Sequence, residues 1–154
     1  MSADVLKTVN MGVEDIMRYL PHRPPMLMLD RVTAYSDSEI QAQKHVPADA
    51  FYFQGHFPGN PILPGVIIVE AIAQAGALIA ALSGAFDASE SLLAFSSIEK
   101  AKFKKPVHPN ETLCVFVKIV KQRNILYKFE GHAKVNDSLV AQVNFSAMQV
   151  PKHP

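Results

Sequence analysis

The stretch that decides the fold runs from Gly55 to Gln74 and reads GHFPGNPILPGVIIVEAIAQ. Its first half is crowded with proline and glycine, which predicts a stiff, tightly turned backbone that holds His56 in one place. From Val66 to Leu82 the chain becomes almost wholly apolar. A run of this kind predicts a buried helix, with Pro64 in its first turn and Gly84 near its end.

Two polar side chains interrupt the apolar run. Glu70 and Gln74 are four residues apart, so they share one face of the predicted helix. We expect Glu70 to be buried, and a buried carboxylate is costly unless it is hydrogen-bonded, paired or protonated. Taken alone, His56 would fit a simple turn residue and Glu70 a buried hydrogen-bonding anchor. A rigid turn bearing a histidine that leads directly into such a helix instead indicates an acid–base pair.

Composition narrows the class of protein. The chain has 154 residues, of which 49% are hydrophobic and 19% charged, and this predicts one well-packed domain spanning residues 1–154. A net charge of +1 does not favour nucleic-acid binding. The single cysteine, Cys114, excludes an intrachain disulfide and favours a reducing, cytoplasmic setting. The apolar run is shorter than the roughly 20 residues of a membrane span and carries two polar side chains, so no membrane insertion is expected.

Hydrophobic periodicity predicts an α+β architecture. A short amphipathic helix is expected at Gly12–Leu20, followed by two paired strands at Met26–Val32 and Glu39–Val46. After the long helix the period changes to that of strands, which are expected at Leu92–Phe103, Thr112–Lys121, Ile125–Val135 and Leu139–Val150. Long antiparallel strands in succession form a meander. Together with the first two strands they make a sheet able to wrap one long helix.

A lysine-rich segment, IEKAKFKKP, spans Ile98–Pro106. Lys100, Lys102 and Lys104 are expected on one face of a strand. They are either a solvated strand face or a docking patch for an acidic carrier or phosphate-bearing ligand.

Other kinds of site are not indicated. The six histidines show no metal-ligand spacing, and the chain has neither a phosphate-binding glycine loop nor a GxSxG motif. The sequence therefore predicts neither a metal site nor a cofactor.

The chain resembles the (3R)-hydroxyacyl-[acyl-carrier-protein] dehydratases of type II fatty acid synthesis, of the FabZ type, from about Ile16 to Val150. The likeness is carried by LPHRPPMLMLDRV at Leu20–Val32, FQGHFPGNPILPGVIIVEAIAQ at Phe53–Gln74 and IEKAKFKKPVHPNE at Ile98–Glu111. It implies the hot-dog fold, a curved antiparallel sheet wrapped around one long central helix. It also implies homodimers that join their sheets edge to edge, often as a trimer of dimers.

The resemblance implies a lyase without a cofactor. Its substrate would be a (3R)-3-hydroxyacyl chain on the phosphopantetheine arm of acyl carrier protein, and its product the trans-2-enoyl thioester. Each site would combine His56 of one subunit with Glu70 of the other, and a glutamate rather than an aspartate at position 70 favours the FabZ branch over the FabA branch. His56 would act as general base at C2, while Glu70 assists departure of the C3 hydroxyl, directly or through water.

Further residues are expected to contact the substrate. Backbone N–H groups near Gly65 and Val66, at the helix N-terminus, are placed to receive charge on the thioester oxygen. The remaining candidates would also fit an ordinary core, and they are Gln74 together with the expected acyl-tunnel residues Phe57, Ile62, Leu63 and Phe95.

The chain departs from the family pattern at several positions. It has Asp49, Ala50 and Phe51 where members often have asparagine, glutamate and proline, and Ala94 where many have a tyrosine associated with gating. Ser97 replaces a glycine or threonine, and Asn110–Glu111 replace glycine–aspartate. These changes spare His56 and Glu70 but bear on acyl-chain selection. Two alternatives remain: a hot-dog acyl thioesterase, and a non-catalytic module that binds acyl chains or their carrier.

Overall fold

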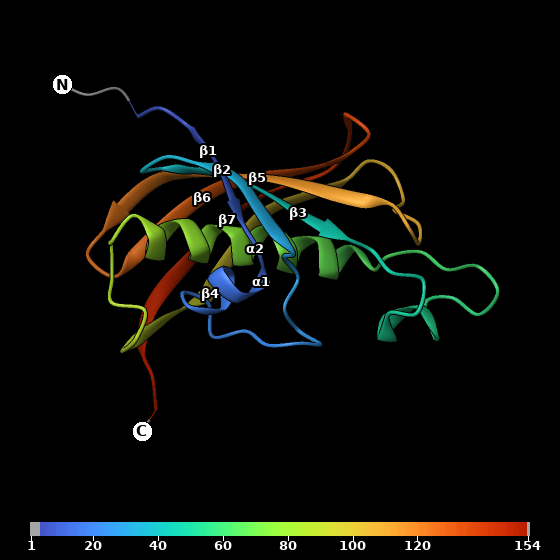
Figure 1. Cartoon of the computed structure of the whole chain (residues 1–154), viewed down its shortest axis with the longest axis horizontal. Helices are drawn as coiled ribbons and strands as arrows, with labels where there is room; N and C mark the ends of the chain where they lie inside the picture. Colours follow the sequence, from blue (N-terminus) through green and yellow to red (C-terminus); the bar gives the residue numbers. More distant parts are fainter. Residues whose placement is uncertain (1–3, 154) are drawn as a thin grey trace.

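The computed structural model describes residues 4–153 and contains a seven-stranded antiparallel sheet with one long helix, α2 (Gly65–Leu82), against it. Figure 1 shows α2 lying along one face of the curved sheet. The strand order is β1-β2-β3-β5-β6-β7-β4. The strands are β1 (Lys7–Met11), β2 (Arg31–Tyr35), β3 (Glu39–His45), β4 (Ser91–Phe103), β5 (Thr112–Arg123), β6 (Leu126–Val135) and β7 (Ser138–Pro151). The predicted α+β fold is confirmed.

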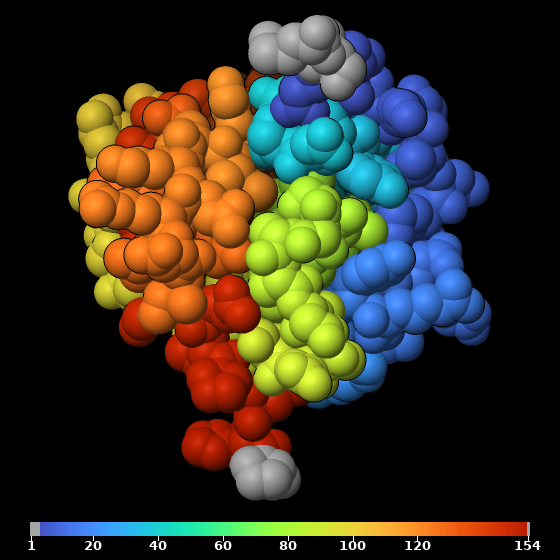
Figure 2. Space-filling view, turned by 90° about the vertical axis from the view of Figure 1, so that its left-hand side faces the viewer, coloured from blue at the N-terminus to red at the C-terminus, as the bar shows by residue number. Residues whose placement is uncertain are grey.

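Helix α2 begins and ends where its sequence indicates. Pro64 is its N-cap residue, and Gly84 follows the C-cap Ser83 with a positive φ of 77°. The N–H of Ala85 donates to the carbonyl of Ala80, and that of Gly84 to the carbonyl of Ala81. This pair of bonds is the Schellman motif, which a residue without a Cβ adopts most readily. Figure 2 looks at this end of the molecule, where the yellow-green chain lies between the orange part of the sheet and the blue N-terminal segment.

By length and composition α2 could also cross a membrane, but a buried core helix passes the same test. Most of its residues are buried in this fold, and two glycines let it approach the sheet closely. A Cβ at Gly76 would lie 3.1 Å from the rings of both Phe129 and Phe145. On β6, a Cβ at Gly131 would meet the Cγ2 atom of Ile72. Small residues on both elements therefore set the distance between helix and sheet.

The N-terminal third differs from the prediction. Strand β1 was not expected, and helix α1 (Val13–Met17) is shorter than Gly12–Leu20. The predicted strand at Met26–Val32 is wrong, because β2 begins only at Arg31. The preceding backbone instead bonds to a side chain: the N–H of Met28 donates to Oε1 of Gln74, and Nε2 of Gln74 donates to the carbonyl of Met26. A polar helix residue thus replaces a neighbouring strand as the hydrogen-bonding partner.

Strand β4 is one edge of the sheet. It pairs with β7 on one side, and within residues 4–153 no strand pairs with its other side. Every residue from Phe95 to Phe103 is exposed, including the large apolar side chains of Phe95, Ile98 and Phe103. A long edge strand with free backbone groups and exposed apolar side chains is a template for pairing with another chain.

Candidate active site

A short loop between η1 (Phe51–Phe53) and α2 holds His56. Within it, Phe57 and Asn60 exchange backbone hydrogen bonds of 3.1 and 2.8 Å, and the N–H of Ile62 donates to the carbonyl of His56 at 2.9 Å. The ring of Phe57 stacks on that of His56 with centroids 4.0 Å apart. The proline- and glycine-rich sequence therefore positions the imidazole as predicted.

The hydrogen bond of the imidazole determines which nitrogen is free. Nδ1 of His56 lies 2.8 Å from the carbonyl oxygen of Ile62. A carbonyl oxygen only accepts, so Nδ1 carries the proton and Nε2 of the neutral ring carries the lone pair. Nε2 is thus the atom available to take a proton.

The hollow beside His56 also exposes the N-terminus of α2. Ile62, Leu63, Gly65 and Val66, all four of them candidate substrate contacts from the sequence, line it. Within residues 4–153, no acceptor bonds to the backbone N–H of Gly65 or Val66. Those N–H groups lie at the positive end of the helix dipole, so they can stabilise an oxyanion. The ring of Phe103 covers Gly65 so closely that a Cβ there would lie 2.8 Å from ring atom Cε1.

The carboxylate of Glu70 lies in a second hollow, of about 160 Å³. Its side chain is 25% exposed, so the expectation of full burial is wrong: the helix is buried, but this face opens into the hollow. Nε2 of Gln74 donates to Oε1 of Glu70 at 2.9 Å, and Nε2 of His22 lies 3.7 Å from the same oxygen. Gln74 also lines this hollow, but its side chain is 1% exposed and its amide already bonds to Met26, Met28 and Glu70.

The two hollows are separate in one chain. Among the residues that the structure describes, none lines both: the His56 hollow is bounded by Phe103–Val107, whereas the Glu70 hollow is bounded by Leu93, Ala94 and Phe95 of β4. Both hollows therefore meet the free edge strand, one near each end. Each holds half of the predicted acid–base pair.

Comparison with known proteins identifies the family of this chain. A protein-family model described as a FabA-like domain matches residues 20–144. The 3-hydroxyacyl-[acyl-carrier-protein] dehydratase FabZ of Koribacter versatilis is 46% identical over 143 residues, which are 92% of this chain and 91% of that protein. The corresponding FabZ of Rhizorhabdus wittichii is 44% identical over 150 residues, 96% of each chain. This chain belongs to the FabZ-type dehydratases of the FabA-like family.

Solved structures show the same fold at lower sequence identity. The dehydratase heterocomplex ApeI:P from Xenorhabdus doucetiae aligns with a TM-score of 0.73 at 20% identity, covering 89% of this chain and 91% of that chain. A mutant thioesterase from Pseudomonas aeruginosa aligns with a TM-score of 0.67 at 14% identity, covering 92% and 96%. Both dehydratases and thioesterases therefore use the fold of this FabZ-type chain, and fold alone does not separate them.

The lysines of the predicted docking patch divide between two places. Lys100 and Lys102 pair with Asn144 and Gln142 of β7, whose side chains line the outer face of the sheet. Lys104 follows the last residue of β4 and lines the His56 hollow together with Lys105, which the sequence had not singled out. Only Lys104 of the predicted three therefore lies beside a candidate catalytic residue.

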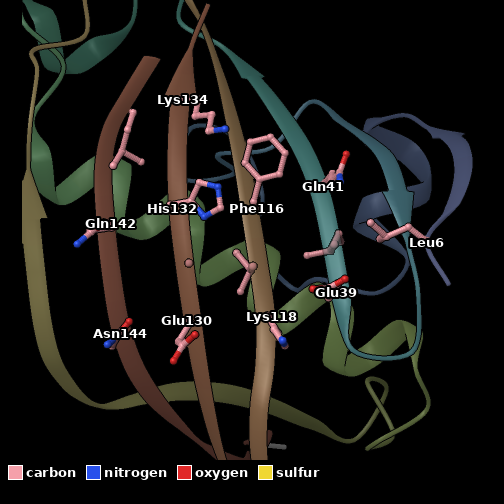
Figure 3. A pocket seen from close by; sticks show the side chains of 14 residues that line it. Leu6, Glu39, Gln41, Phe116, Lys118, Glu130, His132, Lys134, Gln142 and Asn144 are labelled. Carbon is pink, nitrogen blue, oxygen red and sulfur yellow. The ribbon is translucent and has the colours of Figure 1, made fainter. Parts of the chain in front are cut away.

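A larger hollow, of about 670 Å³, lies on the sheet face away from α2. Figure 3 shows its side chains projecting from the strands, with Phe116 and His132 near its centre. The two rings stack at 4.8 Å, and Nζ of Lys134 lies 5.5 Å from the Phe116 ring. This hollow contains neither His56 nor Glu70, so it is separate from the candidate active site.

Proposed function

We propose that this chain removes water from (3R)-3-hydroxyacyl-[acyl-carrier-protein] to give the trans-2-enoyl thioester, with His56 of one subunit and Glu70 of a second copy in each site. The family membership and the names of relatives 36–46% identical to this chain support the reaction. The observation that carries the shared site is the arrangement of the two candidates. They lie in separate hollows that both border the free edge strand.

Antiparallel pairing of two β4 strands would unite these hollows. Phe103 lines the His56 hollow and Phe95 lines the Glu70 hollow, and the residue midway between them is Glu99. A two-fold axis near Glu99 places Phe103 of one strand opposite Phe95 of the other. Each His56 hollow then faces the partner's Glu70 hollow, and two equivalent composite sites form.

The geometry of each half suits dehydration. Nε2 of His56 takes the proton from C2 while the C3–O bond breaks, and Glu70 delivers a proton to the departing hydroxide to form water. Each transfer is typically worth about 10²–10⁴-fold in rate. The free N–H groups of Gly65 and Val66 stabilise the charge that develops on the thioester oxygen. The elimination breaks a C–H and a C–O bond with no net oxidation or reduction, so the proposal includes no cofactor.

The substrate-bearing partner is acyl carrier protein with its phosphopantetheine-linked chain. Lys104 and Lys105 line the mouth beside His56, where cations attract an acidic carrier or the phosphate of its arm. Phe57, 48% exposed, and Phe95, 43% exposed, are apolar surfaces for the arriving acyl chain. The homodimer is the smallest unit that completes a site, a trimer of dimers is the assembly we propose, and the lone cysteine favours the cytoplasm.

The test follows enoyl formation and free thiol together, using 3-hydroxyacyl chains of several lengths on acyl carrier protein. Enoyl product from the wild type, lost in the Glu70→Gln protein, is the expected result. Free thiol without enoyl product would show a thioesterase, the alternative that shares this fold. Binding of the acylated carrier with neither product would show a non-catalytic module.

A further inference from the structure

Two clamps fix the proline-rich loop that precedes β2. The guanidinium of Arg23 donates to the carbonyls of Leu20 and His22 at 2.8 Å each and to that of Met17 at 3.1 Å. The amide of Gln74 binds the loop farther along, at Met26 and Met28. His22 lies between these clamps, so its ring is held against α2. The proposed reaction makes no use of this residue.

The protein makes polar contacts to only one of the two carboxylate oxygens of Glu70 within residues 4–153. Gln74 donates to Oε1 at 2.9 Å, and Nε2 of His22 approaches the same atom at 3.7 Å. Within residues 4–153, no hydrogen bond or ion pair is made to Oε2 of Glu70. Oε1 is therefore held by the protein, which leaves Oε2 as the oxygen available for a proton transfer.

We propose that His22 is a positioning residue for Glu70, which together with Gln74 holds Oε1 through its Nε2 atom and turns Oε2 toward the substrate. The inference rests on the proposed function, because it assigns an orientation to the acid of that reaction. His22 does not touch the reacting atoms in this arrangement. It acts through the carboxyl group, which it holds in one rotamer.

The surroundings of His22 favour its uncharged form. Burial lowers the pKa of His22, the Arg23 guanidinium lowers it further, and the carboxylate of Glu70 opposes both. Strand β4 faces the ring with Leu93 and Ala94, neither of which titrates. Nδ1 is buried without a partner within the described residues, so only the Nε2 end of the ring has a polar contact. A neutral amide can therefore replace the imidazole.

Two amide substitutions at His22 distinguish a role of Nε2 from a role of Nδ1. The amide nitrogen of glutamine is as many bonds from the backbone as Nε2 of histidine, and that of asparagine as many as Nδ1. His22→Gln should retain most of the wild-type kcat, because it keeps a donor near Oε1. His22→Asn should lower kcat by roughly tenfold or more, less than the ~10²–10⁴-fold contribution of the acid itself, with little change in KM. His45→Gln, at an exposed histidine of β3, is the control.

The assay includes the wild type and Glu70→Gln. Equal kcat values for the asparagine, glutamine and wild-type proteins would overturn the positioning role, as would a change confined to KM. An inactive wild type would instead refute the proposed function. Because His22→Asn could unfold the loop, His22→Ala is assayed with and without added imidazole. If imidazole restores kcat in folded His22→Ala protein, the proposal is supported. If imidazole does not restore kcat and the His22→Gln protein is also impaired, the proposal is refuted.

Discussion

Nδ1 of His56 and the carbonyl oxygen of Ile62 are 2.8 Å apart, across a loop that their backbones also close with a hydrogen bond of 2.9 Å. The side-chain bond assigns the proton to Nδ1 and the lone pair to Nε2. It also keeps the ring in one rotamer, beside the free N–H groups of Gly65 and Val66. The candidate base and the candidate oxyanion donors are thus positioned by the same stretch of chain.

His56→Asn should separate the structural role of His56 from its chemical role. The asparagine amide can still donate to the carbonyl of Ile62, but it has no basic nitrogen at the position of Nε2. We expect the unfolding temperature to stay close to that of the wild type, while kcat falls by about 10²–10⁴-fold. Thermal unfolding and the enoyl assay measure the two effects. Wild-type turnover would show that another group removes the C2 proton.

Ala94→Tyr should narrow the hollow beside Glu70. Ala94 lines this cavity of about 160 Å³, with the rings of Phe129 and Phe145 on another side. A phenol ring at position 94 occupies space that the acyl chain would use. We expect kcat/KM to fall more for long acyl chains than for short ones. The measurement is the ratio of kcat/KM for a long chain to that for a short chain, compared between the variant and the wild type. The same loss at every length would place the acyl chain elsewhere.

Gly131→Ala should destabilise the fold without touching the site. The added Cβ would meet the Cγ2 atom of Ile72, at the middle of α2, and overpacking of this kind costs about 1–3 kcal/mol of unfolding free energy. Each kcal/mol lowers Tm by about 2–4 °C in a chain of this size. Gly55→Ala is the control for stability, because a Cβ there has no heavy atom of the described residues within 4 Å. Equal unfolding temperatures would show that the helix can shift away from the sheet.

The sequence predicts the parts of this fold that depend on local pattern. The apolar run ending before Gly84 and the alternating strands after Ser91 are both found in the structure. The prediction of a strand at Met26–Val32 rests on an apolar pattern, and such a pattern does not reveal the bonds that Met26 and Met28 make to Gln74. His22 was missed for a related reason. Its contact with Glu70 joins residues 48 positions apart in the sequence, and no periodicity indicates such a pairing.

His132, on the sheet face away from α2, should make the free energy of unfolding depend on pH. Burial, and secondarily the charge of Lys134, lowers the pKa of His132 from its ordinary value of 6.5. As pH falls through 6.5 the unfolded chain binds a proton before the folded one, so stability is lost. We expect His132→Gln to lose less stability than the wild type between about pH 7.5 and about pH 5. Lys134→Gln should raise the pKa of His132, measured by NMR, whereas parallel titrations would exclude this coupling.

A shared site predicts recovery of activity from two inactive proteins. His56→Asn destroys the base in both sites of a homodimer, and Glu70→Gln destroys the acid in both. In a mixed dimer, one site combines the intact His56 of the Glu70→Gln subunit with the intact Glu70 of the His56→Asn subunit. The other site then carries both substitutions. Random exchange of subunits makes half of the dimers mixed, so about a quarter of wild-type activity should appear.

The experiment unfolds and refolds the two proteins together and compares the enoyl-forming activity with that of each protein refolded alone. If the mixed preparation stays as inactive as its parents while size measurements show that subunits have exchanged, each chain contains its own complete site and the β4 pairing is wrong.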